Sequence, residues 1–358
     1  MQLGFVTAIL HDQSFEDVLA FAAAERYECV EVMCWPSGGP DRKYGGVCHL
    51  DVDGFTQAHA DDTRALCEKH GVAISALGYY SNPLAADAEE AERAQSHLRK
   101  VIDAAPLLGL NTVNSFIGAH TKLPLDENLQ RFTSVWPDLV RYAADRGVRI
   151  GIENCPMLFP NTWPFGMNLA RTPAIWRRMF EIVPLENFGL NYDPSHLAMQ
   201  LIDPITPIRE FGPRIFHTHA KDMRVEPDRL QDIGSLALPM ERSTAKIPGR
   251  GGIDWARWVG ALREVHYNGP VCVEVEDEEF TSTLEGRKES LRLSRDGKTN
   301  AYNWLLRAMI RAQQNRIDEA VDYHARAQNW SVVHADKDAV FQSLLAEAAS
   351  LDPSNQRD

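Results

Sequence analysis

The 358-residue sequence lacks the features that mark membrane, secreted and disulfide-rich proteins. No stretch approaches the roughly 18 consecutive apolar residues of a membrane span. The N-terminus has neither the basic region nor the small-residue cleavage site of a signal peptide. The six cysteines are scattered without a CxxC pair, and a chain of this length needs no disulfide framework. We therefore expect a cytoplasmic protein with reduced cysteines and no membrane partner.

Positive charge is also scarce. The chain has 37 lysines and arginines against 50 acidic residues, which gives a net charge of −13. Nucleic-acid-binding proteins normally carry a basic surface, so we expect no nucleic-acid partner. A GxGxxG motif is absent after the first apolar run, which disfavours a doubly wound dinucleotide-binding sheet. The remaining composition, 44% hydrophobic and 24% charged, is that of a soluble globular protein.

Eight short β-rich runs alternate with amphipathic segments along residues 1–298. Each run is mostly apolar on both faces, as in a parallel sheet that is covered by helices. Eight such units predict a (β/α)8 TIM barrel, with a doubly wound open sheet as the alternative. The predicted strands are 3–9, 29–34, 73–80, 111–118, 148–154, 188–193, 214–219 and 270–276.

Capping signals support the helices between these runs. Ser14 is an N-cap candidate, Thr172 precedes a proline at the first helical position, and Asp254 precedes a third helix. Gly71 is placed to end a helix in the left-handed conformation. Residues 299–358 follow the barrel as a C-terminal helical extension, which we expect to pack on the barrel, on a second copy of the chain or on a partner subunit.

Polar residues gather where the predicted strands end. In a (β/α)8 barrel the chemistry takes place at this end, and these runs end with Glu31, Glu153, Asp193, His219 and Glu274. Several carboxylates at one barrel mouth would repel one another unless a cation lay among them. Three carboxylates and one imidazole suit one divalent ion, Mn²⁺, Mg²⁺ or Co²⁺, with Zn²⁺ as the alternative.

The stretch RIFHTHAKD, at 214–222, sets the register of this site. Side chains alternate along a strand, so His217, His219 and Lys221 share one face. The same alternation places Glu276 on the face of Glu274. We choose His219 and Glu274 as ligands, and His217 and Glu276 remain the alternatives.

Five stretches carry a resemblance to a known family. They occur in order within residues 1–295, and together they resemble the sugar phosphate isomerase/epimerase family of xylose isomerase-like TIM barrels. Ketose 3-epimerases and inosose dehydratases are among its members. The stretches are IEN at 152–154, NYDPSHL at 191–197, HAKD at 219–222, IPGRGGIDW at 247–255 and VEVEDEEF at 273–280.

The resemblance implies roles for six residues. His196 matches a residue that contacts the substrate or supports the metal, and Lys221 matches one that reaches a substrate oxygen. Four residues correspond to the metal ligands: Glu153, Asp193, His219 and Glu274.

Other residues are candidates for substrate contacts. Glu31 ends the second predicted strand, and Trp35 follows it in a loop where an aromatic ring could line a sugar pocket. Trp163 and Phe165 are similar candidates after the fifth strand. His49 lies in a long loop, and such loops are often functional. Arg250 could bind a phosphate or carboxylate group. Both residues are therefore substrate-binding candidates.

These observations predict a metal-dependent enzyme that acts on a carbohydrate or polyol. Glu153 and Glu274 would alternate as ligand and general base in removing a proton next to a carbonyl group, which gives epimerisation or isomerisation. Loss of a β-hydroxyl, as in inosose dehydratases, or cleavage of a 3-keto-glycoside, including a carbon-linked one, is the lyase alternative. A non-catalytic sugar-binding barrel is the alternative from another class. The family resemblance extends more distantly to endonuclease IV-like barrels, which have additional metal-binding histidines on the third and fourth strands. The third and fourth runs of this sequence do not end in histidine, which disfavours an endonuclease.

Overall fold

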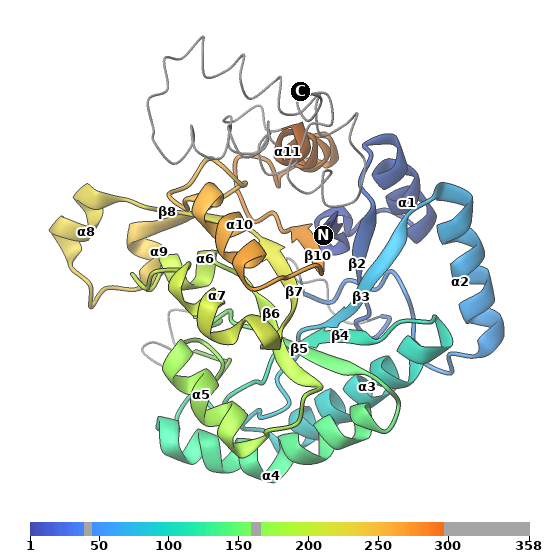
Figure 1. The fold of residues 1–358 in the computed structure, drawn as a ribbon, viewed down its shortest axis with the longest axis horizontal. Helices are drawn as coiled ribbons and strands as arrows, with labels where there is room; N and C mark the ends of the chain where they lie inside the picture. The colour runs from blue at the N-terminus through green and yellow to red at the C-terminus, as the bar shows by residue number, and fades with distance from the viewer. Residues whose placement is uncertain (39–44, 159–165, 297–358) are drawn as a thin grey trace, which may run out of the picture.

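Eight parallel strands close into a barrel in the computed structural model, which describes residues 1–38, 45–158 and 166–296 (Figure 1). Around the barrel the order is β1-β10-β7-β6-β5-β4-β3-β2, so the predicted (β/α)8 barrel is confirmed and the open sheet is excluded. The strands are β1 (Gln2–Val6), β2 (Cys29–Met33), β3 (Ala73–Tyr79), β4 (Thr112–Ser115), β5 (Arg149–Glu153), β6 (Phe188–Tyr192), β7 (Ile215–Ala220) and β10 (Pro270–Val273).

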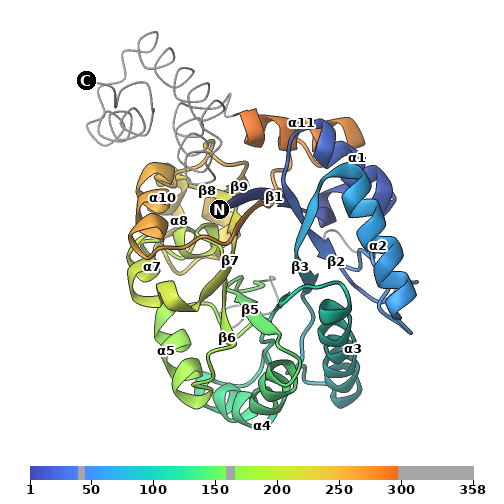
Figure 2. The ribbon, with the colours of Figure 1, turned by 45° about the vertical axis from the view of Figure 1, so that its right-hand side comes forward.

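Helices surround the barrel, as Figures 1 and 2 show. The predicted caps Ser14 and Asp254 accept hydrogen bonds from the amides of Asp17 and Arg257, and Gly71 ends its helix with φ of 66°. Among the elements of the described residues are α1 (Phe15–Ala24), α2 (Gln57–His70), α3 (Ala88–Leu107), α4 (Leu125–Ala144), α5 (Pro173–Ile182), α6 (Ser195–Ala198), α7 (Thr206–Phe211), α10 (Trp255–Glu264), α11 (Leu284–Asp296), η1 (Thr7–Leu10) and η2 (Gly212–Arg214).

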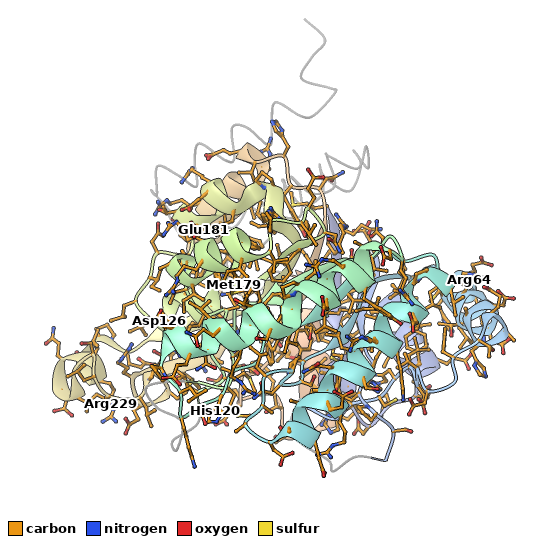
Figure 3. The ribbon with its side chains drawn as sticks, turned by 90° about the horizontal axis from the view of Figure 1, so that it is seen from below. Arg64, His120, Asp126, Met179, Glu181 and Arg229 are labelled. Atoms are coloured by element: carbon orange, nitrogen blue, oxygen red, sulfur yellow. The ribbon has the colours of Figure 1, made fainter. Side chains whose placement is uncertain are left out.

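One excursion interrupts the alternation of strand and helix. After β7 the chain forms an antiparallel hairpin of β8 (Asp222–Val225) and β9 (Ser243–Lys246), which encloses α8 (Pro227–Ile233) and α9 (Pro239–Arg242). The two short helices project from the barrel in Figure 1, and Figure 3 shows Arg229 of α8 and Arg64 of α2 at opposite edges of the molecule. The sequence did not predict this hairpin, because each of its strands has only four residues.

Three predicted strands end three residues earlier than expected, and one of them is the run 111–118, which ends at Ser115. The run 3–9 is a strand only as far as Val6 and then continues as η1, where the Thr7 hydroxyl accepts a hydrogen bond from the Met33 amide at 3.1 Å. The last strand ends at Val273, so Glu274 lies directly beyond it, at the carboxyl end of the barrel. This end of the barrel carries the polar residues.

The C-terminal part of the described chain returns to its beginning. Helix α11 lies beside α1 in Figure 2, and the Tyr27 hydroxyl donates to the carbonyl of Leu291 at 2.8 Å. Arg292 forms an ion pair with Glu25 at 2.9 Å.

None of the helices in the described ranges is long and apolar enough to cross a membrane. The predicted extension 299–358 lies outside the described residues.

The interior of the barrel is tightly packed at β1. A Cβ atom on Gly4 would lie 2.6 Å from the sulfur of Cys29 and 2.9 Å from that of Cys272, so only glycine fits between these two thiols. The main hydrophobic core around the barrel includes several of the largest fully buried side chains, among them Trp136, Trp176, Trp258, Phe132 and Phe188.

Candidate metal centre

Three strands and the short helix α6 bring three carboxylates and an imidazole together at the carboxyl end of the barrel. Glu153 is the last residue of β5, Asp193 directly follows β6, and Glu274 directly follows β10. One ligand atom from each of these residues and from His196 lies within 4.8 Å of all the others. Glu153, Asp193 and His196 are buried, and this spacing is compatible with a single metal ion.

The ring of His219 lies directly beside this group. Its Nδ1 atom lies 3.4 Å from Glu153 Oε1 and 3.5 Å from Glu274 Oε2, so this ring nitrogen faces the carboxylates. His217 is not part of this group. Its ring nitrogens lie 3.0 Å from Asn191 Oδ1 and 3.1 Å from Ser75 Oγ, and with Glu31 and His219 it forms a second buried group whose potential ligand atoms lie within 4.8 Å of one another. The geometry therefore favours His219 over His217 as the strand β7 ligand.

His196 lies closer to the carboxylates than the sequence suggested. Helix α6 begins at Ser195 and places His196 Nε2 3.1 Å from Glu153 Oε1 and 3.3 Å from Asp193 Oδ2. The Ser195 amide holds the other oxygen of Asp193 at 2.7 Å. Asp193 Oδ2 is buried and accepts no hydrogen bond from the described residues, so it is an acceptor that a cation could satisfy.

Lys221 places an ammonium group among the same carboxylates. Its Nζ atom lies 2.7 Å from Glu274 Oε2, 3.1 Å from Glu276 Oε2 and 3.3 Å from Asp193 Oδ2. Burial opposes the charged form, but Glu274 and then Glu276 raise the pKa of Lys221 well above its ordinary value. Burial would raise the pKa of Glu274, but Lys221 and His219 lower it well below the ordinary value. Glu276 is not in the four-residue group, which favours Glu274 as the ligand.

Glu31 is fully buried and contacts His219 on the side of the ring that faces away from Glu153 and Glu274. Its Oε2 is 2.6 Å from His219 Nε2, and its Oε1 accepts a hydrogen bond from the Tyr80 hydroxyl. The side-chain amide of Asn191 donates to the Tyr80 oxygen at 3.0 Å. Burial, followed by the charge of Glu31, raises the pKa of Tyr80 well above its ordinary value, so the phenol remains a donor. Both oxygens of Glu31 are thus engaged, one by His219 and the other by Tyr80, and its predicted contact with the substrate stays a prediction.

The other predicted substrate contacts have partners of their own. The two ring nitrogens of His49 lie 3.0 Å from Thr7 Oγ1 and 3.2 Å from the Leu10 carbonyl oxygen. Arg250 pairs with an exposed glutamate, Glu279, at 3.5 Å. The ring of Trp35 packs edge-on against that of Tyr79, with the ring centroids 5.0 Å apart. Trp163 and Phe165 lie outside the described residues.

Two residues of the stretches that carry the family resemblance, Asn154 and Asp222, form hydrogen bonds with the backbone next to the candidate site. The Asn154 side chain accepts from the amide of Asp193 and donates to its carbonyl, each at 2.8 Å. Asp222 accepts hydrogen bonds from the amides of Gly249 and Ile253 and from the indole of Trp255, at 2.8, 3.1 and 2.9 Å. These residues position the loop 247–255. Asn154 and Asp222 belong to the quoted stretches, but sequence reasoning gave them no role, and it missed Tyr80 altogether.

A family model described as xylose isomerase-like TIM barrel matches residues 19–297. The uncharacterized protein YfiH of Bacillus subtilis is 29% identical over 315 residues, which cover 77% of this chain and 93% of that protein. Inosose dehydratase of Clostridium tetani is 33% identical over 158 residues, 43% of this chain and 52% of that enzyme.

Solved structures have the same fold. The IOLI protein with a bound zinc atom superposes with a TM-score of 0.63 at 20% identity, covering 84% of this chain and 99% of that one. D-psicose 3-epimerase, solved in the presence of D-fructose, gives a TM-score of 0.60 at 16% identity, with 82% and 96% covered.

Proposed function

Because the chain belongs to the family of xylose isomerase-like TIM barrels, we propose that it is a divalent-metal-dependent sugar isomerase or epimerase. Its substrate would be a ketose, a keto-sugar or a polyol with a carbonyl group. The observation that carries the proposal is the convergence of Glu153, Asp193 and Glu274 with His196 at the carboxyl end of the barrel, with His219 directly beside them.

The donor set fits a divalent ion. Glu153, Asp193, His219 and Glu274 would hold it. The buried Oδ2 atom of Asp193 supports this assignment, because it accepts no hydrogen bond from the described residues and the ammonium group of Lys221 lies 3.3 Å from it. Mn²⁺, Mg²⁺ or Co²⁺ suits a mainly oxygen-donating site, and Zn²⁺ is the alternative, which the zinc in the IOLI structure supports. When bound, such an ion polarises a carbonyl and a neighbouring hydroxyl oxygen and so acidifies the adjacent C–H bond.

Glu153 and Glu274 are suited to move that proton. Glu153 ends β5 and Glu274 follows β10, and these strands are three positions apart around the barrel. A flat carbon centre between the two residues would therefore meet one carboxylate on each side. Burial and the charge of Glu274 favour the protonated form of Glu153, but hydrogen bonds from His196 and His219 lower its pKa below the ordinary value. One carboxylate would remove the proton and the other would return it to the opposite face, which inverts the centre.

Lys221 and His196 would stabilise the negative charge that develops on the substrate. Lys221 keeps its proton because Glu274 and Glu276 outweigh the effect of burial on its pKa. A fixed ammonium group in a buried site stabilises an enediolate oxygen more strongly than solvent does. His196 Nε2 lies 3.1 Å from Lys221 Nζ, so both groups can reach the same oxygen.

A lyase is the second candidate. Several curated relatives are inosose dehydratases, including the Clostridium tetani enzyme at 33% identity over part of the chain. The same proton removal followed by loss of a β-hydroxyl would give dehydration, and loss of a β-glycosyl group would cleave a 3-keto-glycoside or C-glycoside. The non-catalytic sugar-binding barrel is less well supported, because all the proposed ligands are present.

Deuterium exchange in D₂O, followed by NMR, tests the proposal. Free ketoses, inososes and 3-keto-glycosides would be incubated with metal-loaded and chelator-treated protein. We expect exchange at one carbon that stops with chelator and falls by about 10² or more in Glu153→Gln. Glu279→Gln, which changes an exposed carboxylate outside the site, should retain the activity. Metal-loaded protein that exchanges no compound would favour the sugar-binding barrel.

A further inference from the structure

Two cysteines face each other at the edge of the barrel. Cys34 directly follows β2, and Cys48 lies opposite it in an isolated antiparallel bridge. The backbone hydrogen bonds on either side run from the Trp35 amide to the Val47 carbonyl, at 3.2 Å, and from the His49 amide to the Met33 carbonyl, at 2.9 Å. Cys34 and Cys48 therefore occupy a non-hydrogen-bonded antiparallel position.

This position has the backbone geometry of a disulfide. Opposed Cα atoms in a non-hydrogen-bonded antiparallel pair are about 4.5 Å apart, and their side chains extend on the same side. Disulfides join residues whose Cα atoms are about 4.4 to 6.8 Å apart. The Cys34 thiol now donates to the Val32 carbonyl at 3.5 Å, so bridging requires rotation of its side chain but no movement of the backbone.

A second pair of neighbouring thiols provides an internal comparison. Cys29 and Cys272 are both in register with Gly4, one on each side of β1. Two strand spacings therefore separate their backbones, about 9 to 10 Å, which is too far for a disulfide. Their sulfur atoms meet only because Gly4 has no side chain. Proximity of thiols alone thus does not make a bridge possible, whereas the opposition of Cys34 and Cys48 does.

The surroundings of the pair indicate how it reacts. Cys34 is fully buried, and burial followed by the nearby Cys48 raises its pKa well above the ordinary value. Cys48 is partly exposed, and burial followed by Asp51 raises its pKa to about 11. Little thiolate forms at neutral pH, so the reaction is slow there and faster in alkaline solution. Cys48 is the thiol that an oxidant in solution can reach.

We propose that Cys34 and Cys48 form a reversible disulfide site that closes with a small-molecule disulfide as the oxidant. The Cys48 thiolate attacks one sulfur of the oxidant, whose S–S bond breaks and releases one thiolate. The Cys34 thiol loses its proton and attacks Cys48 in the mixed disulfide, which releases the second thiolate. The two protein thiols are oxidised, and the oxidant is reduced to two thiols.

The bridge would join the returning segment around Cys48 to the end of β2. That strand carries Glu31, three residues before Cys34, and Trp35 follows it at the rim. Closure would therefore restrain the loop after β2 relative to the barrel. This inference does not depend on the proposed enzymatic activity.

The test uses the full-length protein with oxidised glutathione at alkaline pH, followed by alkylation and peptide mass spectrometry. We expect a Cys34–Cys48 linked peptide, and a midpoint of thermal unfolding that rises on oxidation and falls again with reductant. Cys34→Ala should stop at a glutathione adduct on Cys48. Cys67→Ala is the matched control, because Cys67 is also partly buried with a pKa of about 11, and this variant should form the bridge normally.

The wild-type protein decides the question even if Cys34→Ala does not fold. A stable glutathione adduct on Cys48 with Cys34 still open to alkylation after unfolding would overturn the proposal. The proposal would also be overturned if Cys34 and Cys48 both remained free thiols, or if the linked peptide joined other cysteines.

Discussion

Glu31 Oε2 lies 2.6 Å from His219 Nε2, and this contact determines which nitrogen of the ring faces the carboxylates above it. With Nε2 donating its proton to Glu31, Nδ1 is the nitrogen directed toward Glu153 and Glu274, and it can bind a cation once its own proton has been released. Carboxylates that hold a metal-binding histidine in this way also increase its basicity. The buried pair therefore prepares His219 to bind a cation through Nδ1.

We predict that Glu31→Gln weakens metal binding by about 10- to 100-fold, because the ring loses its charged acceptor. Competition with a chelator of known affinity measures the effect. Tyr80→Phe should cause a smaller loss in the same direction, since it removes one hydrogen bond to Glu31. Glu279→Gln serves as the control, and equal affinities in all three variants would contradict a positioning role for Glu31.

His219→Ala should abolish metal retention, whereas His217→Ala should not. The reason is that only His219 has a ring nitrogen facing the carboxylate group, whereas His217 is hydrogen-bonded to Asn191 and Ser75. Elemental analysis after gel filtration counts the metal ions per chain, and about one is expected for the wild-type protein. The reverse pattern would identify His217 as the ligand.

Lys221→Met should have opposite effects on the metal-free and metal-bound states. The variant leaves Glu274 and Asp193 without their ammonium partner, which costs about 3–5 kcal/mol of stability in the absence of metal. The same loss removes a cation that repels the metal, so affinity should rise about tenfold, or about 1.4 kcal/mol.

Lys246→Met is the matched control for this prediction. Lys246 is also a buried lysine and pairs with Asp277 and Glu279, away from the proposed ligands. Thermal unfolding with and without metal, together with chelator competition, should show that it loses stability without gaining metal affinity. A Lys221 variant that behaves in the same way would refute the competition between lysine and metal.

Metal binding should strengthen as the pH rises. Burial lowers the pKa of His219, but Glu31 and then Glu274 outweigh it and raise the pKa well above 6.5 in the metal-free protein. A proton on Nδ1 competes with the metal, so affinity falls as the pH decreases through the raised pKa and protons are released on binding. Calorimetric titration in buffers with different ionisation enthalpies measures that release, and metal uptake without proton release would argue against Nδ1 as a ligand.

The same proton also contributes to the stability of the metal-free fold, with the opposite dependence on pH. Because the folded pKa is raised, its contribution is complete below about pH 6.5, the ordinary pKa of histidine, and is lost as the pH rises through the folded value. Chelator-treated protein should therefore lose part of its stability on the alkaline side, and metal should restore it there.

The ends of the strands could be read from the sequence because parallel strands that are buried on both faces form continuous apolar runs. Glu153, Asp193 and Glu274 each interrupt or follow such a run, and parallel strands bring their ends to one side. The contact between Glu31 and His219 could not be read, because their strands are far apart in the chain and meet only inside the closed barrel. Tyr80 gave no signal, since an aromatic residue at the end of a strand is usual.

Loops explain the remaining differences. The pairing of Cys34 with Cys48 depends on the path of the loop between them, and no local pattern predicts where that loop returns. His49 was expected to contact the substrate because it lies in a long loop, and this stays a prediction; its ring nitrogens lie within hydrogen-bond distance of Thr7 and Leu10. The carboxylates that the structure brings together are therefore those whose positions the ends of the strands determine.

One carboxylate, that of Asp222, accepts from two amides and an indole spread along the segment 247–255. If one of these donors moved away, the buried carboxylate would lose a hydrogen bond that stabilises its negative charge. Burial already makes that charge costly, as the raised pKa of Asp222 indicates. The segment should therefore open as a unit rather than residue by residue. In hydrogen-exchange measurements the amides of Gly249 and Ile253 would then share one protection factor, although they lie four residues apart.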